Sequence, residues 1–357
     1  MVILHVLNSY FVISFRKQGG AMTQKMIGIL LCLTMPIHAQ WAFLSHKKFA
    51  LAELDAAAPQ NVLIFYQQKI PLFSQLLCAW NAVRPKKGHL SFFVQARNAH
   101  TQRWGLWHKM AEWGDVQRSH SSKSDGFSKN IHVRFETEPY QLADAFRIKV
   151  VGALGASIKN VRALAVTTAN MHAFKSEDIK KTAKLDSVFV ARVPSISQIA
   201  LRHTESNKIC SPVSCTMVTQ HITKRQFDPL RFAKNSYDKG LGIYGSWPFN
   251  MAHAFECGQG NYWFYHTRLN SFIDLHRQLK RGLPIAVSVR GTLPGAPRTF
   301  PHGHLLVVIG WDKQSQKVIC HDPSAPEHHQ VEKRYGLKDF IAAWERSRRL
   351  AYWVETI

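Results

Sequence analysis

Apolar and polar residues alternate along three stretches in the first half of the chain, and this pattern restricts the fold more than any other feature. The stretches are HLSFFVQARN (89–98), NIHVRFETEP (130–139) and AFRIKVVG (145–152). A repeat of two residues places alternate side chains on one face of an extended strand, so each stretch is predicted to be a half-buried strand. Several short strands at this spacing predict an antiparallel β-sandwich-like domain over residues 40–185.

The pattern changes after residue 185. The stretch KSEDIKKTAKLD (175–186) is densely charged and predicts a solvated connector. Beyond it, helix-like patterns such as CSPVSCTMVTQHI (210–222) and FIDLHRQLKRG (272–282) are mixed with strand-like runs such as HLLVVIGWD (304–312). This mixture predicts a separate α+β domain over residues 190–357, and a chain of 357 residues is long enough for two hydrophobic cores.

The N-terminal residues have the features of a targeting segment. A lysine after Met22 is followed by an apolar stretch, 26–37, and then by Ala39 at a small-residue cleavage box. This apolar stretch is too short to span a bilayer comfortably. We therefore expect a signal peptide cut near Ala39, preceded by an unused upstream start over residues 1–21. The chain would then be exported to the periplasm or the extracellular space; the alternative is a retained anchor or a buried helix.

The chain is strongly basic, with a formal net charge of +23. Such an excess favours anionic partners, although the basic residues are dispersed and equally fit a soluble surface with no single partner. No nucleic-acid-binding motif is present. Trp104, Trp107 and Trp113 cluster in one stretch, where they could stack on sugar rings or form part of the core. A carbohydrate or an anionic cell-wall polymer is therefore a candidate partner of the N-terminal domain.

Cys210 stands at the expected N-terminus of a helix. Pro212 favours the first turn of a helix, since its missing N–H has no helical partner there. The free N–H groups and the helix dipole at this position lower the pKa of a thiol and favour the nucleophilic thiolate. The same N–H groups could hold an oxyanion. The alternatives are a buried structural cysteine or one half of a disulfide.

His304 and Asp322 are the candidate partners of this thiol. His304 opens an apolar run that predicts a strand covered on both faces, and a short turn leads into the next strand, 317–320. This hairpin brings Asp322 close to His304, where a carboxylate would hold the imidazole in one tautomer. His302 is a rival base, but it lies farther out in the predicted loop.

Six cysteines are present, and five remain if Cys32 leaves with the signal peptide. An odd number in an exported chain leaves at least one thiol free. Cys257 could pair with Cys78 or Cys320, and the sequence does not decide between them. Cys210, Cys215, Cys320 and His321 are conceivable zinc ligands, but no CxxC or HExxH motif occurs. We expect Cys215 to be a packing residue, and we expect no metal or cofactor.

Three motifs taken together resemble a known family. C-S-P-x-S-x-x-M-V from Cys210, G-H-L-L-V-V-x-G around His304, and H-D-P around Asp322 are similar to the bacteriocin leader peptidase-like (double-glycine peptidase-like) cysteine peptidases. The likeness is greatest to exported bacterial members with a β-rich N-terminal domain. It implies a papain-like fold, with Cys210 as nucleophile, His304 as general base and Asp322 as the orienting residue. It also implies Gln198 as the oxyanion residue, although Gln198 lies twelve residues before Cys210 and Thr204 occupies the usual place.

The resemblance implies an exported cysteine peptidase or amidase that acts on a peptide or another amide. The leader-peptidase relatives are fused to a transporter, and no transporter segment is evident in this sequence, so cleavage of double-glycine leaders is not expected. Two other functions stay open at this stage. The chain could be a non-catalytic envelope-binding protein that uses the papain-like groove, or an acyl-transfer enzyme that uses the same three residues with an amine acceptor.

Overall fold

The computed structural model describes residues 4–7, 10–13 and 40–356, and the chain divides into two compact units, 1–39 and 40–357. In the first unit, β1 (Leu4–Leu7) pairs antiparallel with β2 (Tyr10–Ile13). The expected signal peptide, from Met22 to Ala39, lies outside the described residues. Among the described helices, none is both long enough and apolar enough to cross a membrane.

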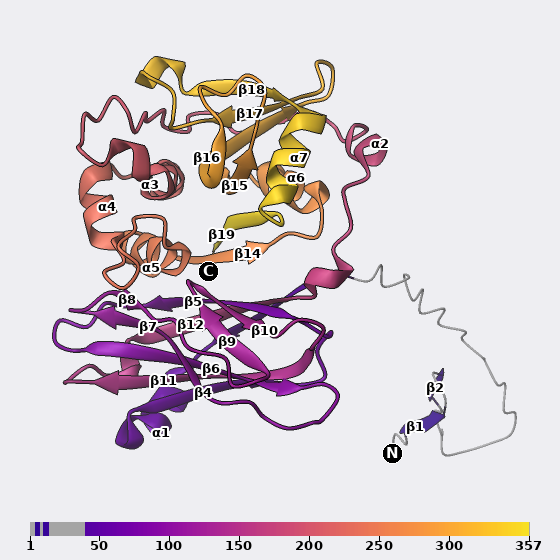
Figure 1. Cartoon of the computed structure of the whole chain (residues 1–357), viewed down its shortest axis with the longest axis vertical. Helices are drawn as coiled ribbons and strands as arrows, with labels where there is room; N and C mark the ends of the chain where they lie inside the picture. Colours follow the sequence, from indigo (N-terminus) through magenta and orange to yellow (C-terminus); the bar gives the residue numbers. More distant parts are fainter. Residues whose placement is uncertain (1–3, 8–9, 14–39, 357) are drawn as a thin grey trace, which may run out of the picture. The chain divides into compact units, whose positions relative to one another are not determined.

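Two five-stranded antiparallel sheets form the N-terminal half of the second unit (Figure 1). One sheet has the order β3-β12-β5-β10-β9, and the other has the order β4-β11-β6-β7-β8. A short helix, α1 (Leu51–Ala57), connects β3 to β4. The strands of the first sheet are β3 (Ala42–Lys48), β12 (Val161–Ala169), β5 (Gln75–Ala82), β10 (Arg134–Thr137) and β9 (Ser128–Ile131). Those of the second are β4 (Val62–Gln67), β11 (Ala143–Ala153), β6 (His89–Asn98), β7 (His108–Gly114) and β8 (Arg118–Ser119).

The alternating pattern does mark the buried face of these strands. In β6, Leu90, Phe92 and Val94 are fully buried between the sheets, as period-two strands require. The prediction of a single strand over 130–139 is wrong, because the chain turns at His132, whose φ of 54° lies in the left-handed region, and forms the β9–β10 hairpin. Trp113 belongs to the core, so it is not available to a ligand.

In the C-terminal half, helices pack around one antiparallel sheet. Its strand order is β14-β19-β15-β16-β17-β18, and the short strand β13 (Val188–Phe189) also pairs with β16. The α+β class is therefore confirmed. The strands are β14 (Tyr262–Arg268), β15 (Ile285–Gly291), β16 (Phe300–Asp312), β17 (Lys317–His321), β18 (Glu332–Gly336) and β19 (Leu350–Thr356). The helices are α3 (Cys210–Thr223), α4 (Pro229–Ser236), α5 (Trp247–Cys257), α6 (Phe272–Lys280) and α7 (Leu337–Arg346).

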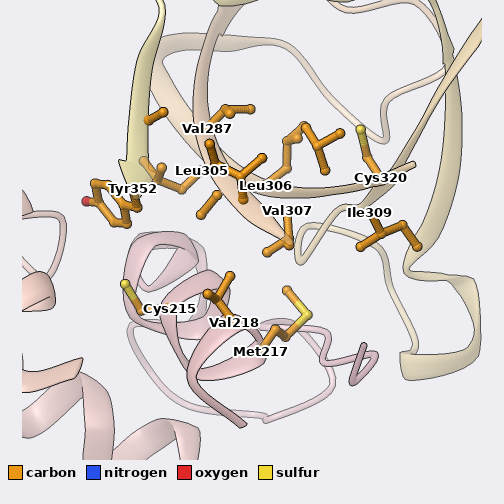
Figure 2. Close-up of a cluster of buried hydrophobic side chains, with 14 of the residues drawn as sticks. Cys215, Met217, Val218, Val287, Leu305, Leu306, Val307, Ile309, Cys320 and Tyr352 are labelled. Carbon is orange, nitrogen blue, oxygen red and sulfur yellow. The ribbon is translucent and has the colours of Figure 1, made fainter. Parts of the chain in front are cut away.

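Helix α3 packs directly on the sheet. Figure 2 shows Cys215, Met217 and Val218 extending from α3 toward the side chains of the strands; the strand residues labelled there are Val287, Leu305, Leu306, Val307, Ile309, Cys320 and Tyr352. The Ser214 hydroxyl also donates a hydrogen bond of 3.0 Å to the Leu305 carbonyl. These contacts fix the N-terminus of α3 against the strand that carries His304. Residues 305–309 of β16 are all buried, so the strand is covered on both faces as predicted.

The sandwich and the C-terminal half share a core through α5. Phe249 of α5 packs among sandwich residues, with its ring stacked on Trp113 at 6.0 Å and edge-on to Trp80 at 5.6 Å. The Phe264 amide donates to Asn81 Oδ1 at 2.8 Å, and Arg84 pairs with Glu256 at 3.1 Å. All eight residues of β5 are buried, since one face of its sheet meets the second sheet and the other meets the C-terminal half.

The charged connector is solvated only in part. It forms a single helical turn, α2 (Ile179–Thr182), and its lysines are exposed. The Glu177 side chain, in contrast, is only 6% exposed and accepts a hydrogen bond of 3.0 Å from the Phe272 amide at the start of α6. The connector is therefore attached to the C-terminal half by a buried carboxylate, which the local charge pattern of the sequence did not predict.

Candidate active site

Cys210 is the first residue of α3, as the Ser-Pro that follows it predicts. Its side chain is partly exposed, and the residue belongs to the turn that also contains Ser211 and Pro212. The first-turn N–H groups have no helical acceptors, so the partial positive charge of the helix dipole is directed at this position. The backbone N–H groups of Ser211 and Leu305 both act on the thiol and stabilise its ionised form.

His304 lies near the start of β16 and is 1% exposed. Gly303, just before it, has a φ of +96°, which favours glycine, and the ladder between β15 and β16 bulges between the pairs Val289–His304 and Gly291–Phe300. The Phe300 ring stacks on the imidazole with a centroid distance of 4.1 Å and an interplanar angle of 9°. His302 is exposed. The bulge thus turns His304 inward and leaves His302 at the surface.

Asp322 follows the last residue of β17 and is fully buried. Its Oδ1 lies 2.7 Å from His304 Nε2 and also accepts hydrogen bonds from the Ser324 amide at 2.9 Å and the Ser324 hydroxyl at 2.6 Å. Its Oδ2 accepts a hydrogen bond of 2.7 Å from the Tyr335 hydroxyl. Both carboxylate oxygens therefore have hydrogen-bond partners. Since His304 Nε2 is bonded to Asp322, Nδ1 is the ring nitrogen that can exchange a proton with the Cys210 thiol.

The electrostatics of the three groups favour a charged pair. Burial opposes ionisation of Cys210, but the His304 imidazole and the neighbouring N–H groups outweigh it and lower the pKa of the thiol. Burial alone would lower the pKa of His304, but the Asp322 carboxylate and the Cys210 sulfur raise it to about 9. Burial would likewise raise the pKa of Asp322, but His304, Ser324 and Tyr335 hold it well below its usual range. The three shifts together favour a thiolate, an imidazolium and a carboxylate over the uncharged forms of the cysteine and the histidine.

Gln198 is fully buried and lies next to the loop that carries Asp322. Its backbone N–H donates to the Pro323 carbonyl at 2.8 Å, and its Nε2 donates to the Ser206 carbonyl at 2.7 Å. Its Oε1 has no hydrogen-bond partner among the described residues. The long spacing to Cys210 is taken up by a turn-rich segment, 199–208, and Thr204 is exposed in that segment. The oxyanion role of Gln198 stays a prediction, with one amide hydrogen committed to Ser206.

The C-terminal half is similar in sequence to a family of known proteins. Residues 190–352 match the model of the Peptidase_C39 like family. The resemblance to these cysteine peptidases is therefore confirmed for residues 190–352, which we call the C39-like region. Among solved structures, xylellain, a cysteine protease from Xylella fastidiosa, aligns over 53% of this chain and 93% of its own, at 14% identity and a TM-score of 0.32. The sequence matches no curated protein.

The other described cysteines of the chain are unsuited to nucleophilic chemistry. Cys78, Cys215, Cys257 and Cys320 are free thiols, so the pairings considered for Cys257 are not formed. Burial raises the pKa of Cys78 and of Cys257 to about 12, and it raises that of Cys215 and Cys320 well above the usual value. Within residues 40–356, no three His, Cys, Asp or Glu side chains are arranged to bind a metal ion.

Three residues of the C39-like region support this site and were not predicted. Ser324 had a local signal, since a serine two residues after an aspartate can close a side-chain turn. Phe300 stacks on the imidazole because of the bulge at Gly303, which sequence spacing does not reveal. Tyr335 comes from the neighbouring strand β18, and its distance from Asp322 along the chain gave no sign of the contact.

Proposed function

We propose that the chain is a cysteine peptidase or amidase in which Cys210, His304 and Asp322 act as nucleophile, proton carrier and orienting residue. The observation that carries the proposal is the buried hydrogen bond of 2.7 Å between His304 Nε2 and Asp322 Oδ1, in a site where the same imidazole lowers the pKa of the Cys210 thiol. A non-catalytic binding groove would not need a thiol whose pKa is lowered by a neighbouring imidazole. The match to the Peptidase_C39 like family supports a cysteine peptidase.

The geometry suggests a two-step reaction. The Cys210 thiolate attacks the carbonyl carbon of the substrate amide, and the tetrahedral intermediate collapses when His304 Nδ1 gives its proton to the leaving amine. The thioester that results is attacked by water, whose proton passes to the now neutral imidazole. Collapse of the second intermediate releases the new carboxylic acid, which loses its remaining proton to solvent, and restores the thiolate and the imidazolium. Asp322 holds the ring in place and balances its charge throughout.

The oxyanion of each intermediate needs donors close to the thiol. The first-turn N–H groups of α3 are of the right kind, and the second amide hydrogen of Gln198 is a further candidate. The expected substrate is a peptide or another amide. We also propose that the chain is exported, on the basis of the apolar stretch that ends near Ala39.

The test is turnover of a peptide mixture in water enriched in ¹⁸O. Hydrolysis places one ¹⁸O atom in the new C-terminal carboxylate, whereas transfer to an added primary amine gives an amide without the label. Mass spectrometry of the products separates the two reactions. The Cys210→Ala variant is the negative control. Labelling of the wild-type protein by a thiol-directed, activity-based probe checks that the site is competent when no peptide in the mixture is cleaved. Absence of both labelling and cleavage would refute the proposal.

A further inference from the structure

The outer face of the sheet β4-β11-β6-β7-β8 carries a cluster of aromatic rings and cations that the peptidase function does not use. Leu63 and Phe65 of β4, and Ile148 and Val150 of β11, point into the core. The residues between them therefore point outward. Outward-facing residues from three strands and two tryptophans from the β6–β7 loop form what we call the cationic–aromatic face: Tyr66, Phe93, Trp104, Trp107, Arg147 and Lys149.

The sheet register sets the order of these side chains. Lys149 is paired with Ile64 on one side and with Phe93 on the other, and Arg147 is paired with Tyr66. Arg147 and Lys149 are two residues apart on one strand, so the two cations point the same way about 7 Å apart. The Lys149 ammonium lies 4.9 Å from the centroid of the Phe93 ring, and the Arg147 guanidinium lies 5.5 Å from that of Tyr66.

The β6–β7 loop adds a tryptophan to each cation. Arg147 lies 4.0 Å from the Trp104 ring centroid, and Lys149 lies 4.5 Å from that of Trp107. The loop is anchored over the sheet, because Gln95 Nε2 donates to the Gly105 carbonyl at 2.9 Å and the Leu106 amide donates to Asp125 Oδ2 at 2.6 Å. The rings are therefore held in position before any ligand arrives, which reduces the entropy lost on binding.

The cations on the outer side of this sheet fall into two classes, those paired with a carboxylate and those of the cationic–aromatic face. Arg97 forms two hydrogen bonds with Asp144, and Lys109 pairs with Glu112. Neither Arg147 nor Lys149 has a carboxylate partner within the described residues. Cation–π contacts leave part of the charge and of the hydrogen-bonding capacity of both groups available. Two unneutralised cations therefore stand beside partly exposed aromatic rings.

The surrounding surface is also apolar. Ile64 is 55% exposed, Leu106 is 66% exposed and Tyr66 is 40% exposed. Scattered exposed apolar residues are ordinary, but a contiguous group around unpaired cations is typical of a binding surface. A flat aromatic ring can pack on the C–H face of a sugar, while a guanidinium or an ammonium binds a carboxylate or a phosphate.

The geometry points to this face as a binding site for an anionic polysaccharide, in which the rings contact the sugars and Arg147 and Lys149 contact their acidic groups. The net charge of +23 attracts such a polymer at long range. Single-stranded nucleic acid has related chemistry, but the sequence contains no nucleic-acid-binding motif, and the proposed export would bring the face to envelope polymers instead. The site does not include Cys210, so a negative binding result would not contradict the peptidase proposal, and a lack of peptidase activity would not contradict the binding site.

The test measures binding of the full chain to polygalacturonate by isothermal titration calorimetry at low and high salt. The double variant Arg147→Gln/Lys149→Gln is compared with Lys180→Gln/Lys184→Gln, which removes the same charge from exposed lysines of the connector. We expect the first pair of changes to weaken binding at least about tenfold more than the second, since one charge-assisted hydrogen bond is worth about a factor of ten in affinity. Trp104→Ala and Trp107→Ala should each weaken binding as well, with circular dichroism confirming the fold.

Neutral dextran and an oligothymidylate serve as competing probes. Preference for polygalacturonate over both, lost in the Arg147/Lys149 variant, supports the assignment. No saturable binding of polygalacturonate, equal binding of dextran, tighter binding of the oligothymidylate, or equal losses in the two double variants would each overturn it.

Discussion

Asp322 contacts His304 across the end of the β16–β17 ladder, with 2.7 Å between Oδ1 and Nε2. The last pair of this ladder is Val307 with His321. His304 lies three residues before that pair on β16, and Asp322 lies one residue after it, so the two side chains meet where the strands separate. The contact depends on the register of one hairpin, and a shift by one residue would turn the two groups to opposite faces of the sheet.

Among the cysteines that the structure describes, we expect Cys210 to be the one that reacts at neutral pH. Its pKa is lowered, whereas burial raises the pKa of Cys78, Cys215, Cys257 and Cys320. Since the thiolate is the nucleophile, brief treatment with iodoacetamide should alkylate Cys210 first. Peptide mass spectrometry reads the sites, and His304→Ala should slow the labelling. Preferential labelling of Cys215 or Cys257 would mean that the nucleophile has been misassigned.

A series of alanine variants should rank the residues of the site. Cys210→Ala and His304→Ala should each abolish turnover, because members of one catalytic unit are not additive. Asp322→Ala should retain a measurable activity, about 10–100-fold above the other two, since it orients the imidazole and takes no proton. His302→Ala is the matched control and should be nearly neutral, because that side chain is exposed. An inactive His302→Ala variant beside an active His304→Ala variant would show that the base is His302.

The pH profile of kcat/KM should be bell-shaped. The active form holds a thiolate and an imidazolium, so activity rises as pH passes the lowered pKa of Cys210 and falls as pH passes about 9, where His304 loses its proton. The two limbs belong to the coupled pair. Asp322→Asn removes the charge that raises the pKa of His304, so the upper limb should move to lower pH. An upper limb that stays in place would show that Asp322 does not set the charge of His304.

Tyr335 should stabilise the fold through Asp322. Its hydroxyl donates to a fully buried carboxylate, and a hydrogen bond to a charged group contributes about 2 kcal/mol. Tyr335→Phe should therefore lower the free energy of unfolding in urea by about that amount. Tyr262→Phe is the control, because Tyr262 donates only to the neutral Ile222 carbonyl at 3.2 Å and should lose about 1 kcal/mol. Equal losses in the two variants would contradict a charge-assisted role for Tyr335.

Local patterns along the sequence were sufficient to predict the three candidate catalytic residues. Pro212 indicated the start of α3, an apolar run indicated the strand after His304, and a short turn indicated where Asp322 would return. Contacts between distant segments could not be predicted in this way. Tyr335 reaches Asp322 from the next strand, and Phe249 enters the core of the other half. Their side chains follow ordinary helix or strand patterns, and only the tertiary arrangement gives them these partners.

The connector should be the first site of limited proteolysis, and the two fragments should then stay together. We propose residues 40–185 and 190–357 as the two domains. Lys180, Lys181 and Lys184 are exposed in and beside a single helical turn, so brief trypsin treatment should cut there. Phe249, however, is fully buried among Trp80 and Trp113 of the sandwich, and this contact does not depend on an intact connector.

Native mass spectrometry should therefore detect a complex of the two nicked fragments. Phe249→Ala leaves a cavity in the shared core and should weaken the association by about 3–5 kcal/mol, the usual effect of removing a buried phenylalanine ring. In that variant the fragments should separate at micromolar concentration after the same cut. Leu279→Ala is the matched control, since Leu279 is also buried but lies on α6, which packs against β13, β15 and β16 of the C-terminal half; its nicked fragments should remain associated. Fragments that separate in the wild-type protein, or early cuts spread through the sandwich strands, would contradict a shared core at Phe249.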